Sequence, residues 1–477
     1  MKKIFLSNLV LVVTLNLLIK PFYIFGIDRG VQNSVGASEY GLYFALYNFV
    51  YLFQIINDFG LQNYNHSVLS KYERLIPKYL PKILAVKIVL ALSFTLVTIF
   101  LALIVGFKDF IWPTLFIIII NQILVSLIMF LRTTLSALGH YRLDSLLSIS
   151  DKFLLIMGVG YVLWFSDYQL NIHDFIVFQS VALGITLVIT LLFTQQKSGL
   201  FSYRWRFDET FSLAILKKSF PYALILLLMT LYTRMDGVML ERLLKNGKEE
   251  AGIYAASYRI LDAFSNVGLL FAGLLLPMFA KMIRSGGPLK ELTETARNAL
   301  LTFSLMIISI ALVYGQSIID LLYHDATIYW GQVFQLLFLS YLGISLGYIY
   351  GTLLTASENI RVMNTVFLAG VVLNFLLNLI FINLWQAWGA ALATVITQIA
   401  VSCTITWLAH RNLLLKADLL GWVRLGIFFI MVYIFSRYCK SWSLHLLPSL
   451  ISIGIFSLFS ALSLQLVNLG DWLKTER

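Results

Sequence analysis

Charged side chains interrupt the long apolar segments of this 477-residue chain in a few places. The densest such region covers residues 217–281, where two apolar segments flank a short polar turn. Inside each segment a cation and a carboxylate lie at similar distances from the turn, and so at similar depth if both segments cross a bilayer. Charge at that depth is costly, which makes these side chains candidates for a functional site. They are Arg234 and Asp236 in the first segment, and Arg259 and Asp262 in the second.

The composition is that of a membrane protein. Hydrophobic residues make up 59% of the chain, charged residues make up 12%, and the mean hydropathy is +0.84. About a quarter of the residues of a soluble domain are charged, and apolar stretches recur here from end to end, so we predict a polytopic membrane protein. The net charge of +11 does not indicate nucleic-acid binding, because the basic residues gather in short loops between apolar segments.

These segments predict an all-α fold with about 14 transmembrane helices, since a helical span needs about 20 apolar residues. Basic residues are most frequent in the loops on the side of Met1, so the positive-inside rule predicts that both termini are cytoplasmic. The predicted spans cover residues 4–27, 38–62, 83–106, 111–139, 144–166, 172–194, 217–241, 251–280, 293–321, 330–356, 361–384, 387–409, 420–437 and 446–468.

Two sequence matches indicate an internal repeat. Residues 41–47 resemble residues 252–258 at an offset of 211, and residues 135–142 resemble residues 354–361 at an offset of 219. Two matches in the same order at nearly the same offset predict a duplicated unit of six spans. An even number of spans keeps both copies the same way up, which is a parallel repeat, and such repeats place a substrate site between the halves.

The repeat predicts four parts of the chain, two of which are six-helix lobes. The last two spans then form an addition to the second lobe. The parts are an N-terminal six-helix lobe at residues 1–196, a cytoplasmic linker at 197–216, a C-terminal six-helix lobe at 217–410, and two additional transmembrane helices at 411–477.

The motifs resemble those of the polysaccharide transporter family, the O-antigen flippases of the MATE-like superfamily. The residues that carry the resemblance are Tyr40-Gly41-Leu42-Tyr43, Asp58-Phe59-Gly60-Leu61, Arg234-Met235-Asp236, Ala251-Gly252-Ile253-Tyr254 and Tyr258-Arg259. The resemblance implies two lobes around a central cavity and transport by alternating access. It also implies that the substrate is an undecaprenyl-pyrophosphate-linked oligosaccharide, a repeat unit of a surface polysaccharide, moved across the bacterial inner membrane.

A pyrophosphate group concentrates negative charge, and an Arg side chain can donate two parallel hydrogen bonds to it. Arg234 and Arg259 are the first candidates for this contact, with Lys20 and Arg29 in support. The related lipid II flippases carry an Arg/Asp pair in span one and an Arg in span eight, and Asp28-Arg29 and Arg259 occupy comparable places. We expect Asp236 and Asp262 to form ion pairs with the nearby Arg side chains.

Asp58 has no basic residue near it in the sequence. A lone carboxylate in a low-dielectric span could carry a coupling proton, so transport could be coupled to H⁺ or Na⁺. Alternatively, Asp58 caps a helix break at Gly60, or pairs with Arg132. Lys87 lies near the predicted inner surface, and we expect its amino group to reach that surface.

Two other functions compete with the flippase. A drug or organic-cation antiporter of the MATE type is favoured less, because a cationic substrate needs a cavity dominated by carboxylates. A membrane polysaccharide polymerase or ligase is favoured less, because no outer loop is long enough to look like a transfer site. The sequence shows no metal-ligand spacing and no phosphate-binding glycine loop, so we predict no enzyme, metal or cofactor. The predicted partners are membrane lipids and polysaccharide polymerase machinery.

Overall fold

The structure is a computed structural model that describes residues 18–62, 65, 69, 76–200, 208–442 and 445–467. This described part is helical and contains no strand. Eleven of its helices are long and apolar enough to cross a membrane, which agrees with the predicted all-α polytopic class. Most of the first predicted span, residues 4–17, lies outside the described residues, and the number of fourteen spans stays a prediction.

The chain divides into two compact units, residues 1–241 and residues 242–477. The predicted lobe limits at residues 196 and 217 stay predictions. Residues 201–207 of the predicted linker lie outside the described residues. The rest of that linker is mostly helical, because α9 (Glu209–Leu243) begins well before residue 217.

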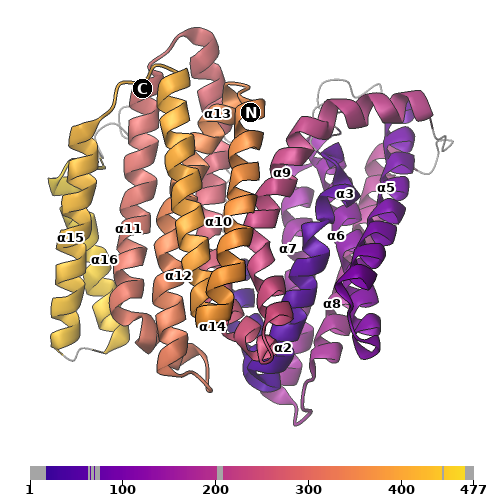
Figure 1. Ribbon diagram of the computed structural model, residues 1–477. Coiled ribbons are helices and arrows are strands. Elements are labelled where there is room, and N and C mark those ends of the chain that lie inside the picture. Colours follow the sequence, from indigo (N-terminus) through magenta and orange to yellow (C-terminus); the bar gives the residue numbers. More distant parts are fainter. Residues whose placement is uncertain are drawn as a thin grey trace. The chain divides into compact units, whose positions relative to one another are not determined.

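Unit 1 is a bundle built around α6, which packs against α2, α7 and α8, while α3 packs against α5 (Figure 1). The helix α9 lies against α2. Gly237 of α9 has no Cβ atom, so the side chains of Phe44 and Asn48 on α2 can approach the α9 backbone closely. The helices are η1 (Tyr23–Asp28), α2 (Arg29–Leu52), α3 (Gln54–Asp58), α5 (Ile76–Val105), η3 (Asp109–Ile111), α6 (Trp112–Ala137), α7 (Tyr141–Phe165) and α8 (Ile172–Ser198).

A break inside α2 separates the first two predicted spans. Gly36 has a φ of 83°, so the helical path is interrupted between residues 35 and 37. The Tyr40 hydroxyl donates a 2.7 Å hydrogen bond to the Asp28 carboxylate across this break. Both side chains are buried, so the bond fixes the geometry at which the chain turns from one span into the next.

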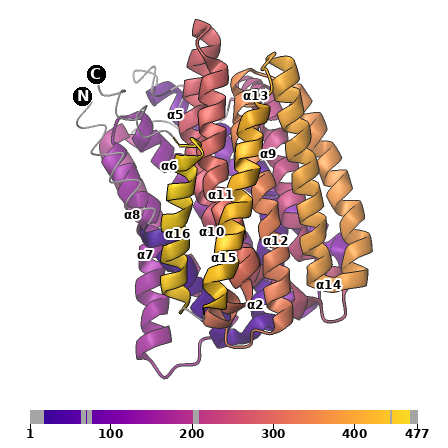
Figure 2. The ribbon, with the colours of Figure 1, turned by 90° about the vertical axis from the view of Figure 1, so that its left-hand side faces the viewer.

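Unit 2 is organised around α11 and α12, which pack along each other, with α10 and α14 against α12. The last two helices are the pair drawn in yellow, and both pack on α11 (Figure 2). The helices are α10 (Gly247–Ser285), α11 (Leu289–Leu322), α12 (Ile328–Leu346), η5 (Gly347–Gly351), α13 (Thr352–Ala356), α14 (Ile360–Asn412), α15 (Leu419–Ser441) and α16 (Leu446–Ser463).

The 53 residues of α14 are two helices joined by a sharp turn. One straight helix of that length would measure about 80 Å, far more than the roughly 30 Å hydrocarbon core. Gln386 interrupts the helix with φ 55° and ψ −130°. Gly389 lies against the Phe381 carbonyl, where any Cβ atom would overlap it, so the two halves fold back on each other (Figure 1). This turn lies between the spans predicted at 361–384 and 387–409.

The start of the second half of α14 is capped by a side chain from another helix. Glu250 of α10 accepts a 3.0 Å hydrogen bond from the Ala387 backbone N–H and another of 3.0 Å from the Tyr329 hydroxyl. Glu250 is only 4% exposed. A helix N-terminus favours a negative charge, so the carboxylate satisfies a backbone donor that the turn would otherwise leave unpaired.

The two units share local structure at the positions of the predicted repeat. In unit 1 the His140 N–H bonds the Leu135 carbonyl at 3.0 Å, and in unit 2 the Asn359 N–H bonds the Leu354 carbonyl at 3.0 Å. A residue with positive φ precedes each of these donors, Gly139 in unit 1 and Glu358 in unit 2. Each pair of equivalent positions differs by 219, the offset of the sequence match. The same helix ending therefore occurs in both copies.

Candidate functional site

Unit 1 gathers three cations on neighbouring helices. Lys20 lies within electrostatic range of Arg132 on α6 and of both Lys152 and Asp151 on α7. Asp151 pairs with Lys152 at 3.1 Å, and Arg132 pairs with a second α7 carboxylate, Asp144, at 2.9 Å. With three cations against two carboxylates, the cluster keeps an excess of positive charge. We call these five residues the cation cluster.

The predicted partner of Asp58 is wrong. Its carboxylate pairs with Lys87 of α5, with Nζ 2.6 Å from Oδ1, and Arg132 pairs with Asp144 instead. The expectation that Lys87 reaches the membrane surface is also wrong, because its side chain is fully buried. Buried charges are stable when they are paired, and Asp58 is the carboxylate within reach of this amine.

Asp58 is the last residue of α3, a short helix with non-helical backbone at both ends. Phe53 separates α3 from α2, and Phe59 after it has a φ of 51°. The side-chain amides of Gln54 and Asn57 both donate 3.2 Å hydrogen bonds to the Gln122 carbonyl of α6. Asp58 therefore lies next to the predicted break at Gly60. No structural observation tests whether it also carries a coupling ion, so that role stays a prediction.

A stripe of four tyrosines runs along α2. Tyr40, Tyr43, Tyr47 and Tyr51 are spaced three or four residues apart, which places them on one face of the helix. Successive ring centroids are 5.8, 6.0 and 5.9 Å apart, and the last two rings are nearly parallel at 15°. We call this face the tyrosine stripe.

Other helices of unit 1 hold the tyrosine stripe in place. Gln179 of α8 donates a 2.9 Å hydrogen bond to the Tyr43 hydroxyl. Lys152 of the cation cluster lies within electrostatic range of Tyr43 and Tyr47. At the other end of the stripe, the Arg234 guanidinium of α9 lies 5.5 Å from the Tyr51 ring centroid. The stripe thus extends from the cation cluster to Arg234.

The other predicted site residues of unit 1 lie on α2 and α9. Arg234 belongs to the same compact unit as Lys20 and Arg29. Arg29 is the first residue of α2 and follows Asp28, which Tyr40 engages. Asp236 is 1% exposed on α9. The ion pairs expected for Asp236 and Asp262 stay predictions, as does substrate binding by the Arg and Lys residues.

Arg259 and Asp262 lie on α10 of unit 2. Every residue from Ala251 to Leu261 is buried except Arg259, which is half-buried. The aromatic residues at these positions repeat those of unit 1. Tyr254 and Tyr258 stack at 5.6 Å and occupy the places of Tyr43 and Tyr47 at the repeat offset of 211. Arg259 is therefore the most accessible side chain on this stretch of α10.

Arg297 of α11 is a buried cation with a structural role in unit 2. Its guanidinium binds Asp418 at 2.5 Å and lies 5.0 Å from the Trp422 ring, which joins α11 to the start of α15. Burial would raise the pKa of Asp418, but hydrogen bonds from Arg297 and from the Gly421 N–H lower it below the ordinary value. Arg297 thus anchors the helices added to unit 2.

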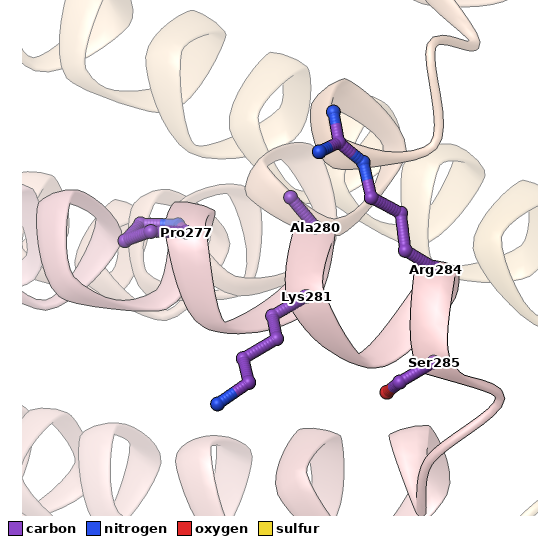
Figure 3. A pocket seen from close by; sticks show the side chains of 5 residues that line it. All are labelled: Pro277, Ala280, Lys281, Arg284 and Ser285. Carbon is purple, nitrogen blue, oxygen red and sulfur yellow. The ribbon is translucent and has the colours of Figure 1, made fainter.

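A surface depression of about 460 Å³ lies near the end of α10. Its lining residues are Pro277, Ala280, Lys281, Arg284 and Ser285. Figure 3 shows Lys281 and Arg284 extending from the helix in different directions. The two cations do not converge on a shared point, so we assign no ligand to this depression.

Lys152 and the tyrosine stripe are not among the site residues predicted from the sequence. A signal for Lys152 was present, because Asp144, Asp151 and Lys152 recur at seven- and eight-residue spacing within an apolar segment, which places them on one helix face. The tyrosines were visible as a repeated motif, but their stacking depends on the packing of α7, α8 and α9. In the described part of the chain, no three His, Cys, Asp or Glu side chains come together as a metal ion would require.

Comparisons with known proteins agree with this architecture. The chain is similar to a structure of the lipid II flippase MurJ in an inward closed conformation, with a TM-score of 0.72, 13% identity, and coverage of 96% of this chain and 99% of that one. It is also similar to a mutant of the Vibrio cholerae MATE transporter VcmN, with a TM-score of 0.56, 15% identity and coverage of 86% and 98%. No curated protein sequence is similar enough to match.

A third similar structure is a MOP superfamily transporter from Pyrococcus furiosus, with a TM-score of 0.59, 12% identity and coverage of 85% and 95%. At these identities the likeness establishes the fold. Residues 10–283, more than half of the chain, match the model of a family described as polysaccharide biosynthesis protein. The shared fold agrees with the predicted all-α polytopic class. The chain belongs to the polysaccharide biosynthesis protein family.

Proposed function

We propose that this protein is a flippase that moves an undecaprenyl-pyrophosphate-linked oligosaccharide from the inner to the outer leaflet of the bacterial cytoplasmic membrane. Both termini lie in the cytoplasm, and transport proceeds by alternating access. The family assignment and the transporter fold support this proposal. The observation that carries it furthest is the cation cluster. Lys20 lies within electrostatic range of Arg132 and Lys152, which belong to two helices long and apolar enough to cross a membrane.

The chemistry of a pyrophosphate matches these cations. Charged residues within membrane helices are expensive, and their usual role is to line a substrate path or to pair with each other. Here the pairing is incomplete, because the cluster has one more cation than carboxylates. Arg259 of unit 2, and Arg234 and Arg29 of unit 1, add guanidinium groups that suit phosphate oxygens. The lipid tail stays in the bilayer during transport.

The proposal is tested in cells that lack the protein. Lipid-linked oligosaccharide should accumulate with its sugar accessible only from the cytoplasmic face, and the surface polymer should be lost. The intact protein and an Arg437→Ala variant, which changes an exposed cation on α15, should restore transport. Arg259→Ala should reduce transport roughly 10- to 100-fold, as expected for loss of a charge-assisted hydrogen bond.

The same cells separate the flippase from a MATE-type antiporter. Normal lipid intermediates, together with raised sensitivity to cationic drugs, would reject the flippase and favour the antiporter. The Arg259→Ala variant could be present in the membrane at wild-type level and transport normally. In that case Arg259 is not part of the site, and the proposed flippase function still stands.

A further inference from the structure

Two residues of the tyrosine stripe are partly exposed. From Gly41 to Leu52, every residue of α2 is buried except Tyr47 and Tyr51, which are half-buried. These two rings lie 5.9 Å apart at 15° and form one continuous aromatic strip. The first two tyrosines are buried, where Tyr40 binds Asp28 and Tyr43 contacts Gln179 and Phe175.

The surroundings of this open strip do not suit lipid chains. Lys152 lies within electrostatic range of Tyr47, and the Arg234 guanidinium lies 5.5 Å from the Tyr51 ring. A lipid-facing surface with two cations at its edges would be costly. The combination of flat aromatic surface and nearby cations suits a molecule that is both polar and built of rings with apolar faces, and that carries negative charge.

We infer that Tyr47 and Tyr51 form a stacking subsite for the sugar rings of the transported molecule, with Lys152 and Arg234 beside it. The inference rests on the proposed function and assigns the saccharide portion to α2. One face of a pyranose ring presents C–H groups, which pack on an aromatic ring, while its hydroxyls reach polar groups at the edge. Stacking tolerates different sugars, because it reads the ring face and not a particular hydroxyl.

The internal comparison between the units supports a role specific to unit 1. At the repeat offset of 211, Tyr47 corresponds to Tyr258, which is buried, and Tyr51 corresponds to Asp262. The open aromatic strip is therefore absent from α10. If these tyrosines served only to pack α2 against its neighbours, we would expect aromatic residues with the same burial at the equivalent positions of α10.

The test compares two ligands on the purified full-length protein. One is undecaprenyl pyrophosphate, which has no sugar, and the other is the glycosylated lipid extracted from cells that lack the protein. Tyr47→Leu and Tyr51→Leu should each weaken binding of the glycosylated lipid roughly 5- to 10-fold, the scale of one aromatic contact. Binding of undecaprenyl pyrophosphate should stay within about twofold of wild type. Tyr51→Phe should keep the wild-type affinity for both.

The control is Tyr433→Leu, because Tyr433 is a half-buried tyrosine stacked on Phe429 at 6.1 Å on α15. It should change neither affinity. Equal weakening of both ligands by the Leu variants, or no weakening, would overturn the stacking subsite. If the wild-type protein binds neither ligand, the proposed function itself fails.

A measurement on the unaltered protein covers the case in which a Leu variant does not fold. The glycosylated lipid should protect Tyr47 and Tyr51 from nitration by tetranitromethane, read by peptide mass spectrometry. It should leave Tyr433 unprotected, and undecaprenyl pyrophosphate should protect none of the three. Equal protection by both lipids would assign these tyrosines to the lipid or the pyrophosphate and would overturn the sugar subsite.

Discussion

Lys87 and Asp58 form an ion pair of 2.6 Å that joins α5 to α3 inside unit 1, and the lysine side chain is fully buried. The two residues are 29 positions apart. The Asp58 side chain is 18% exposed. The pair therefore neutralises a charge that could not otherwise remain in the bundle, and it fixes α3 beside the irregular turn at Phe59.

Removing one charge of this pair should cost stability. Lys87→Met leaves Asp58 unpaired and should lower the free energy of unfolding by about 3 kcal/mol, the lower end for a broken buried pair because Asp58 is partly exposed. Lys87→Met combined with Asp58→Asn removes both charges and should recover most of that loss. Thermal unfolding of wild type, Lys87→Met, Asp58→Asn and the double variant gives the coupling energy. If the double variant is no more stable than Lys87→Met, the pair is not the source of the effect.

The turn within α14 should reject a side chain at position 389. Gly389→Ala places a methyl group against the Phe381 carbonyl, so the hairpin must open or its backbone must shift. We expect a loss of about 2–4 kcal/mol, as for other overpacked sites, measured by thermal unfolding. The control is Gly454→Ala in the helix α16, where no atom lies within 4 Å of the added methyl group. Alanine should be neutral or stabilising by up to about 1 kcal/mol there. Equal effects at the two positions would contradict the close approach.

The Glu250 cap offers a matched pair of adjacent carboxylates. Glu250→Ala removes the acceptor for the Ala387 N–H and the Tyr329 hydroxyl, and should destabilise the protein by about 1–2 kcal/mol. Glu249→Ala removes the same charge from an exposed neighbour and should have little effect. Hydrogen exchange at the start of the second half of α14 should rise only in the Glu250 variant. Comparable exchange in both variants would show that the cap is dispensable.

The start of α9 should respond to acid through Asp208. A hydrogen bond from Lys82 is the main cause that lowers the pKa of Asp208 to about 2, and the Phe211 N–H adds to it. A carboxyl whose pKa is depressed in the folded state stabilises that state above its unfolded pKa of about 3.9, and loses this contribution as the pH falls toward about 2. Wild type should therefore lose stability relative to Asp208→Asn between about pH 4 and pH 2, measured by thermal unfolding. If the stability of the two proteins changed with pH in the same way, the Lys82–Asp208 ion pair would not contribute to the acid response.

The sequence by itself determined that this chain is a helical membrane protein with an internal repeat. Membrane insertion depends on the composition of each apolar segment, so it can be read locally. The turn at Gln386 lies between two predicted spans, and the break at Gly36 lies at the predicted start of another. The equivalent helix endings at Gly139 and Glu358 occur at the offset that the sequence match gives.

Only the tertiary structure decided which charges meet and which aromatic rings stay partly exposed. Asp58 pairs with Lys87, and Arg132 with Asp144, because these choices depend on how helices pack and not on sequence spacing. The partial exposure of Tyr47 and Tyr51 has the same origin, since the other residues from Gly41 to Leu52 are buried by the packing of the bundle. Hydrophobicity is a property of each segment, whereas the partner of a charge or a ring depends on the contacts between segments.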